Sequence, residues 1–189
     1  EGAIGEVRSV QASFGFTLAN PQTNIRLVPE LGGGALLDAG SYPLSLIRLA
    51  MGSAPQRVRA DASWAASGVD ISLSATLFYA DGRRAQLSCA MDAGAHRHAM
   101  IVGSAGTIET DYLNHTVDAP GDARGFLPSR MRMRRGGAGT IAFEDIAAAT
   151  GSGFRFEAEA FARVIAARDQ AAIDRAAQAS IDNAATLDA

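Results

Sequence analysis

The sequence predicts an α+β fold, a large, mostly antiparallel and open-faced β-sheet of about six to eight strands with helices packed on one face. Between Gln56 and Asp92 apolar and polar residues alternate, a period of two that is typical of half-buried strands. The segments 31–52 and 154–189 instead repeat their apolar residues at helical spacing. No internal repeat or linker divides the chain, so these patterns indicate a single α+β domain over residues 1–189.

The first predicted elements are a strand and a helix that are joined through glycines. Val7–Phe16 alternates as a strand does, and a polar loop follows at 20–24. Three consecutive glycines, 32–34, then lead into an apolar helical run that continues to Gly52. Pro43 removes one backbone hydrogen bond of this helix and crowds the turn before it, so we expect a kink or break just after Tyr42.

The middle of the chain is predicted to form three long strands, Gln56–Ala66, Val69–Ala80 and Arg83–Asp92. Asp81-Gly82, between the last two, is a strong hairpin signal. The second strand should carry apolar residues on one face and mostly polar residues on the other. The apolar set is Val69, Ile71, Leu73, Ala75, Leu77 and Tyr79, and the other set is Asp70, Ser72, Ser74, Thr76 and Phe78.

Shorter strands and two helices complete the expected fold. The strands are His96–Gly103, Thr107–Tyr112, Met131–Arg135 and Thr140–Phe143. Residues 113–128, with two prolines, are expected to form a long excursion from the sheet. Helical spacing returns at Phe154 for one helix that runs to about Arg168, and an alanine-rich second helix is expected from Arg175 onward.

Composition excludes several kinds of chemistry. All 17 basic residues are arginine, so neither Schiff-base nor lysine general-base chemistry can come from this chain. Cys89 is the single cysteine, which excludes an internal disulfide, and the net charge of −3 argues against nucleic acid as a partner. No apolar run approaches the ~20 residues of a membrane span. Because the chain starts at Glu1, without methionine, we expect a fragment of a longer, cytoplasmic protein, with a signal ahead of Glu1 left open.

Asp38 and Tyr42 are the main candidate catalytic residues. They are four positions apart, so on a helix they lie on the same face. A carboxylate beside a phenol, approached over glycines without side chains, suits a site that donates or removes a proton. The alternative is a capped core helix with a glycine hinge. The glycines 32–34 lack the G-x-G-x-x-G spacing, so this chain alone should not bind a dinucleotide.

Other candidate sites are weaker. His96 and His98 could suggest a metal site, but no third ligand follows at suitable spacing, and we expect none. The alternation in Arg130–Arg135 indicates a strand with its arginines facing outward. Cys89 is interpreted as a small buried apolar residue. The aromatic residues Phe14, Phe16, Trp64 and Phe78 are expected in the core or at an interface.

Three motifs, in order, resemble the C-terminal domain of the glucose–fructose oxidoreductase / inositol dehydrogenase (Gfo/Idh/MocA) family. Gly2-Ala3-Ile4-Gly5-Glu6-Val7 resembles the start of that domain. The segment Leu31–Gly52 is similar to the G-G-G-x-L-x-D-x-G-x-[HY] helix of the family, and Ile101–Ile108 is similar to its I-x-G-[ST]-x-G-[TS]-[ILV] hairpin. Tyrosine at position 42, where many members have histidine, resembles dihydrodiol and xylose dehydrogenases. Ser45 replaces a common acidic residue, which weakens any substrate assignment from the inositol dehydrogenase branch.

The resemblance implies a division of labour within a longer enzyme. A preceding Rossmann domain, absent from this chain, would hold NAD or NADP and supply a catalytic lysine. This domain would supply part of the pocket for a carbohydrate-like substrate, and its open sheet face would form a homodimer or higher homo-oligomer. Tyr42 would transfer the proton, Asp38 would orient the pair or anchor a substrate hydroxyl, and Arg26 would contact substrate. Gly33 and Gly34 would let the backbone approach the cofactor.

These observations support an expected function and two alternatives. The expected function is the substrate and oligomerisation domain of an NAD(P)-dependent oxidoreductase, which acts on a sugar, polyol or cyclic diol. The first alternative is a non-catalytic dimerisation or ligand-binding domain of the same fold. The second is a free-standing α+β ligand-binding protein.

Overall fold

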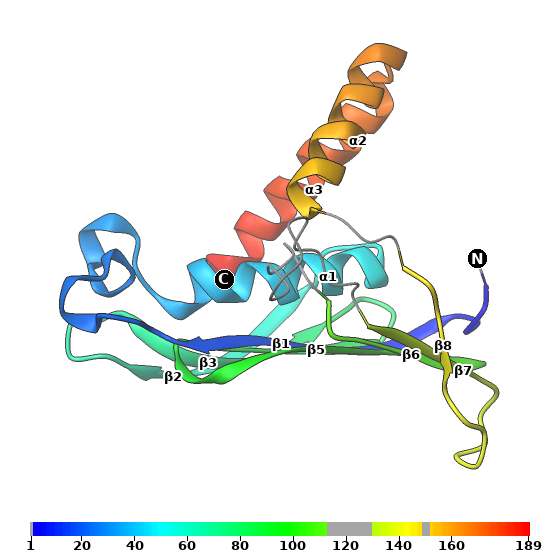
Figure 1. The fold of residues 1–189 in the computed structure, drawn as a ribbon, viewed down its shortest axis with the longest axis horizontal. Helices are drawn as coiled ribbons and strands as arrows, with labels where there is room; N and C mark the ends of the chain where they lie inside the picture. Colours follow the sequence, from blue (N-terminus) through cyan, green and yellow to red (C-terminus); the bar gives the residue numbers. More distant parts are fainter. Residues whose placement is uncertain (1, 113–129, 149–151) are drawn as a thin grey trace, which may run out of the picture.

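The computed structural model describes residues 2–112, 130–148 and 152–189, and shows one eight-stranded sheet with helices on one face. The strand order is β2-β3-β4-β1-β5-β6-β7-β8. Only β1 and β4 pair in parallel among the described strands, and every other neighbouring pair is antiparallel. Figure 1 shows the sheet edge-on with all three labelled helices on the same side, so the predicted α+β fold is confirmed.

Most predicted strands are confirmed to within a few residues. The observed strands are β1 Val7–Thr17, β2 Arg57–Trp64, β3 Asp70–Phe78, β4 Arg84–Ala90, β5 Asp92–Gly103, β6 Gly106–Thr110, β7 Met131–Arg135 and β8 Glu144–Asp145. The predicted strand Thr140–Phe143 is wrong. A hydrogen bond from Ile141 N to Ala138 O extends the glycine turn, so pairing with β7 starts only at Glu144. The expected excursion 113–128 lies outside the described residues.

The helices begin with a π-helical turn, Leu36–Gly40, which leads directly into α1, Ser41–Met51. The expected kink after Tyr42 is therefore wrong: the irregularity precedes Tyr42, and α1 runs through Pro43. Pro43 is the third residue of α1, just after the π-helical turn. The wider π-helical turn brings Gly40 close to the sheet, since a Cβ on Gly40 would lie 3.2 Å from Cys89 Sγ.

Two helices follow the last strand, α2 Gly153–Ala167 and α3 Gln170–Leu187. The end of α2 agrees with the prediction, but α3 begins earlier than the expected Arg175. The Asp169 side chain accepts a hydrogen bond from Ala172 N at 2.9 Å, and this N-cap starts the helix at Gln170. No helix in the described part of the chain is both long and apolar enough to cross a membrane.

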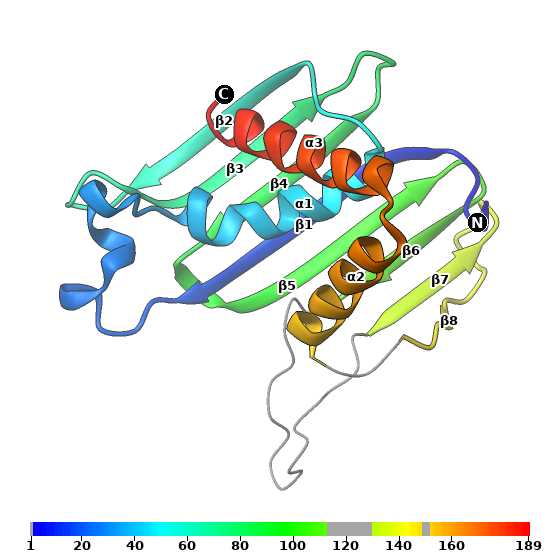
Figure 2. The same ribbon diagram turned by 90° about the horizontal axis from the view of Figure 1, so that it is seen from above.

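The core lies between α1 and the central strands (Figure 2). As predicted, apolar residues of β3 such as Leu73 and Leu77 face the helices, where they pack with residues of α1 and α3. The polar residues Ser74 and Thr76 lie on the opposite face. The fully buried residues with the largest side chains are Ile47, Leu77, Met91, Val10 and Pro43. One face of the sheet is thus covered by helices, and the other stays open.

Candidate active site

Arg26, Asp38 and Tyr42 come together over the end of β1 that carries Phe14 and Phe16. Asp38 lies in the π-helical turn and Tyr42 at the start of α1. Arg26 belongs to a short 3-10 turn, Ile25–Leu27, between β1 and that helix. In Figure 2 the short turns lie beyond the end of the β1 arrow, and α1 lies over the sheet. The three candidate residues are therefore brought together.

Arg26 and Asp38 form an ion pair, with 2.8 Å between Arg26 Nε and Asp38 Oδ2. Their side chains are 39% and 32% exposed, so solvent reaches both. The pKa of Arg26 is raised above its ordinary value, because its contact with the Asp38 carboxylate outweighs the opposing effect of burial. The negative charge of Asp38 adds to this rise.

The glycines before the helix bring the Arg26 turn into position. Gly34 N donates to Arg26 O at 2.9 Å, and Gly33 N donates to Val28 O at 3.1 Å. A Cβ on Gly33 would lie 2.6 Å from Arg26 O, so only glycine allows this approach. Gly33 and Gly34 thus pack against the chain itself, and both N–H groups are already bonded. Their approach to a cofactor stays a prediction.

Asp70 anchors the start of the site helix, a role the sequence did not reveal. Its Oδ2 accepts a hydrogen bond from Leu36 N at 2.7 Å, and its negative charge lies at the helix N-terminus. The prediction placed Asp70 on the outward face of its strand. The pairing of β2 with β3 is irregular between Ser63 and Trp64, opposite Asp70, which lets Asp70 turn toward the helices.

Aromatic rings hold Tyr42 in place while leaving it accessible. The Tyr42 ring meets Phe14 edge-to-face, with 5.2 Å between ring centroids and 88° between planes. Phe14 lies 5.8 Å from Phe16, and Arg26 Cζ lies 5.9 Å from the Phe16 centroid. Tyr42 is nonetheless 40% exposed. Phe14 and Phe16 form the floor of the site, which agrees with their alternation on one face of β1.

Arg97 also borders this floor, and the sequence alone did not reveal it as part of the site. It is paired with Phe14 across β1 and β5, and its Cζ lies 4.9 Å from the Phe14 centroid. His98, the next residue, lies on the other face of the sheet and contacts Asp111 at 3.4 Å. In the described residues no group of three or more His, Cys, Asp or Glu side chains could hold a metal ion.

The remaining sequence candidates lie elsewhere. Cys89 is buried as expected, and burial raises its pKa to about 12. Trp64 is 69% exposed at the end of β2. Arg132 pairs with Glu109 and Arg135 with Glu144, so these two arginines of β7 form ion pairs with neighbouring strands.

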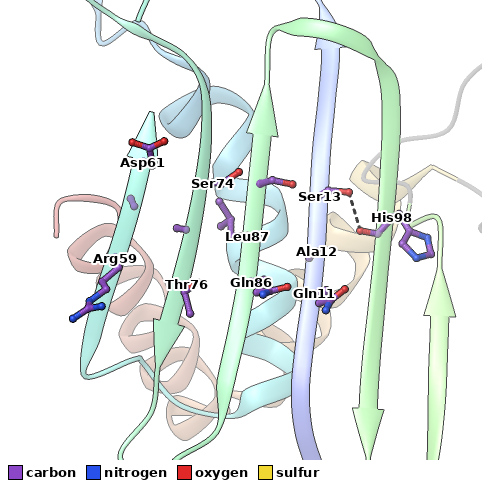
Figure 3. Close-up of a pocket in the computed structure, with 13 residues that line it drawn as sticks. Gln11, Ala12, Ser13, Arg59, Asp61, Ser74, Thr76, Gln86, Leu87 and His98 are labelled. Atoms are coloured by element: carbon purple, nitrogen blue, oxygen red, sulfur yellow. Dashed lines mark hydrogen bonds between the residues drawn. The ribbon is translucent and has the colours of Figure 1, made fainter. Parts of the chain in front are cut away.

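A shallow groove of about 660 Å³ lies on the open face of the sheet, away from the candidate active site. Figure 3 shows its polar side chains, which come from five strands. They include Gln11, Ser13, Arg59, Asp61, Ser74, Thr76, Gln86, Ser88 and His98. No helix of the described chain covers this face.

Known proteins resemble this chain over the same elements. A family model described as the GFO/IDH/MocA C-terminal domain matches residues 1–109. Trans-1,2-dihydrobenzene-1,2-diol dehydrogenase from Danio rerio is 34% identical over 110 residues, which make up 58% of this chain and 32% of the relative. D-xylose 1-dehydrogenase (NADP(+)) 2 from Haloferax volcanii is 29% identical over 187 residues, 98% of this chain and 53% of the relative.

A solved structure extends the comparison to the fold. The aldose-aldose oxidoreductase from Caulobacter crescentus, complexed with glycerol, superposes with a TM-score of 0.70 and 27% identity. The superposition covers 88% of this chain and 47% of that protein. The chain therefore matches between about a third and about half of the length of these relatives.

The sequence motifs, the open-faced sheet and the comparisons agree. The dihydrodiol and xylose dehydrogenases are the branch that Tyr42 indicated, and the family model spans both the first strand and the Asp38–Tyr42 helix. The chain belongs to the Gfo/Idh/MocA family and corresponds to the C-terminal domain of that family.

Proposed function

We propose that this chain is the substrate-binding and oligomerisation domain of an NAD(P)-dependent oxidoreductase that acts on a sugar, polyol or cyclic diol. The observation that carries the proposal is the accessible Tyr42 phenol, held edge-on by Phe14 beside the Arg26–Asp38 ion pair. The names of the relatives support the substrate class, since they act on xylose, aldoses and a dihydrodiol.

Tyr42 would move the proton of the reacting hydroxyl. Oxidation of an alcohol needs a base for this proton, while the bound nicotinamide accepts the hydride. A free tyrosine titrates near ~10, so nearby positive charge is needed to make a phenolate available at neutral pH, and a lysine of the preceding domain and the oxidised nicotinamide would supply that charge. Arg26 is held by Asp38 at 2.8 Å, so its own charge is already matched. Asp38 would thus act mainly as a positioning residue.

The nicotinamide cofactor would be held mainly by a preceding domain. Residues 31–34 offer no phosphate cradle, because Gly33 N and Gly34 N already donate to backbone carbonyls of the chain. The chain also has no lysine. We expect the isolated chain to contribute only the substrate side of the site, with Arg26 as a substrate contact.

A second role, homo-oligomerisation, is supported by the open face of the sheet. The face of an eight-stranded sheet is broad enough for the ~1,200 Å² that a specific interface usually buries in total. Its polar residues offer hydrogen-bond partners to a second copy (Figure 3). This surface would serve equally in a non-catalytic dimerisation domain, so the phenol, and not the groove, distinguishes the two candidate functions.

Replacing Tyr42 by phenylalanine in the parent enzyme tests the proposal. Tyr42→Phe keeps the edge-to-face contact and removes only the hydroxyl, so turnover should fall by about 10²–10⁴-fold with little change in KM. Tyr79→Phe is the matched control, because the Tyr79 hydroxyl is buried, has no hydrogen-bond partner in the described part of the chain and lies outside the site. Equal turnover in both variants would favour the non-catalytic domain.

A further inference from the structure

Arg97 lies at the edge of the candidate active site without a role in the chemistry described above. Its guanidinium stacks on Phe14, with Cζ 4.9 Å from the ring centroid, and Tyr42 contacts the same ring at 5.2 Å. Arg97 and Tyr42 thus border one aromatic floor. The chain brings them together through the β1–β5 pairing and the docking of α1 on β1.

The charge of Arg97 is not compensated within the described residues. Its Nη1 is buried and has no hydrogen-bond partner in residues 2–112, 130–148 and 152–189. Arg26 and Arg48 also have buried guanidinium nitrogens, but each of these side chains is paired with a carboxylate. A buried N–H of a cation that forms no hydrogen bond is costly, so such groups normally have a partner in the functional state.

The surroundings of Arg97 supply no anion among the residues that the structure describes. Besides contacting Phe14, Arg97 lies near Tyr112. Burial raises the pKa of the Tyr112 phenol above its ordinary value, and the positive charge of Arg97 offsets part of this rise. The Tyr112 hydroxyl donates a hydrogen bond to Ser13 O at 2.9 Å, which holds the phenol toward β1. In the same site the charge of Arg26 is already matched by Asp38. Arg97 is therefore the cation at this floor for which the described chain offers no counter-ion.

We propose that Arg97 binds a carboxylate group of the substrate, across the Phe14 ring from Tyr42. This inference rests on the proposed function and narrows its substrate class from sugars, polyols and cyclic diols to sugar acids. A planar guanidinium presents paired N–H donors whose geometry matches a carboxylate or phosphate, and stacking on Phe14 holds that plane in position. Arg26, paired with Asp38, would then face the uncharged hydroxyls.

Ligand binding to the parent protein, loaded with NADPH so that the sugar cannot be oxidised, tests this proposal independently of turnover. Calorimetry should show that D-glucuronate binds at least about tenfold more tightly than D-glucose. Arg97→Gln should lose about 10- to 100-fold in affinity for D-glucuronate and leave D-glucose unchanged, the range for a lost charge-assisted hydrogen bond. Arg97→Lys keeps the positive charge without the paired N–H donors. Its affinity for D-glucuronate should lie between those of the wild type and Arg97→Gln.

A matched control variant and thermal melts separate loss of the Arg97 contact from general effects on charge or folding. Arg175→Gln removes an exposed arginine of α3 and should bind both sugars like the wild type, and the melt of each variant checks that it folds. Equal affinities of the wild type for the two sugars, undetectable D-glucuronate binding, or an unchanged D-glucuronate affinity in Arg97→Gln would overturn the proposal. A loss confined to NADPH affinity would assign the oxyanion to the cofactor and also contradict it. Because binding is measured without catalysis, an inactive Tyr42→Phe enzyme leaves this test intact.

Discussion

Gly34→Ala should destabilise the chain far more than a glycine-to-alanine change usually does. Gly34 has φ of +128°, where a side chain costs on the order of 1–3 kcal/mol. A Cβ there would also lie 2.2 Å from Asp70 Oδ1 and displace the carboxylate that accepts from Leu36 N. Losing this charge-assisted hydrogen bond costs about 1.5–3 kcal/mol, so the free energy of unfolding should fall by about 4 kcal/mol in total.

Urea unfolding of the isolated chain measures this change, with Gly32→Ala as the control. Gly32 also has positive φ, +71°, but a Cβ there would meet nothing within 4 Å, so its cost should be about 1–2 kcal/mol. In an Asp70→Ala background the clash with the carboxylate is absent, and Gly34→Ala should then cost only the ~1–3 kcal/mol of its backbone conformation. If Gly34→Ala and Gly32→Ala are equally destabilising in the wild-type background, the proposed anchoring of the site helix by Asp70 is refuted.

Three further predictions concern the ion pair, alkaline stability and assembly. In steady-state kinetics Asp38→Asn should lower turnover less than Tyr42→Phe does, and a larger loss than in Tyr42→Phe would contradict a positioning role. Asp38→Asn should also lower the free energy of unfolding by less than ~1 kcal/mol, because the ion pair with Arg26 is partly exposed. Burial raises the pKa of Tyr79 to about 12 and that of Cys89 to about 12, from ordinary values of 10.0 and 9.0. The folded state keeps protons that the unfolded chain releases, so stability measured by urea unfolding should not change through these two groups between pH 7 and about pH 9 and should fall from there toward pH 12. Tyr79→Phe should reduce that fall, and an unchanged pH profile would contradict the burial argument. Light scattering should show oligomers of the wild-type chain. The double variant Ser74→Glu/Ser88→Glu adds negative charges to the open face of the sheet and should give the 19.6 kDa monomer. A wild-type chain that is already monomeric at high concentration would contradict the proposed assembly.

The strands could be predicted because their information is local. Alternation in β3 separated Leu73 and Leu77 from Ser74 and Thr76, and the structure has these pairs on opposite faces. The Asp38–Tyr42 spacing predicted that the two residues lie on one helical segment, and the structure has Asp38 in the π-helical turn that leads without a break into α1 and Tyr42. Periodicity thus predicted most of the sheet and the helical segment that carries the two candidate residues.

What the sequence did not reveal depends on contacts between distant segments. Asp70 looked like an outward residue of a strand, and only the irregular β2–β3 pairing turns it toward Leu36 N. Arg97 had no distinguishing sequence pattern, and only its register opposite Phe14 places it against the ring that Tyr42 also contacts. Register and irregular pairing are tertiary properties that single-sequence periodicity does not encode.

The pH dependence of turnover tests most directly the central claim that Tyr42 transfers the proton. In the oxidation direction, kcat of the parent enzyme should rise with pH as the phenol loses its proton, and then level off. In Tyr42→Phe the remaining activity should no longer show that rise, whereas Tyr79→Phe should show it in full. If the same rise persists unchanged in Tyr42→Phe, another group transfers the proton and the claim is contradicted.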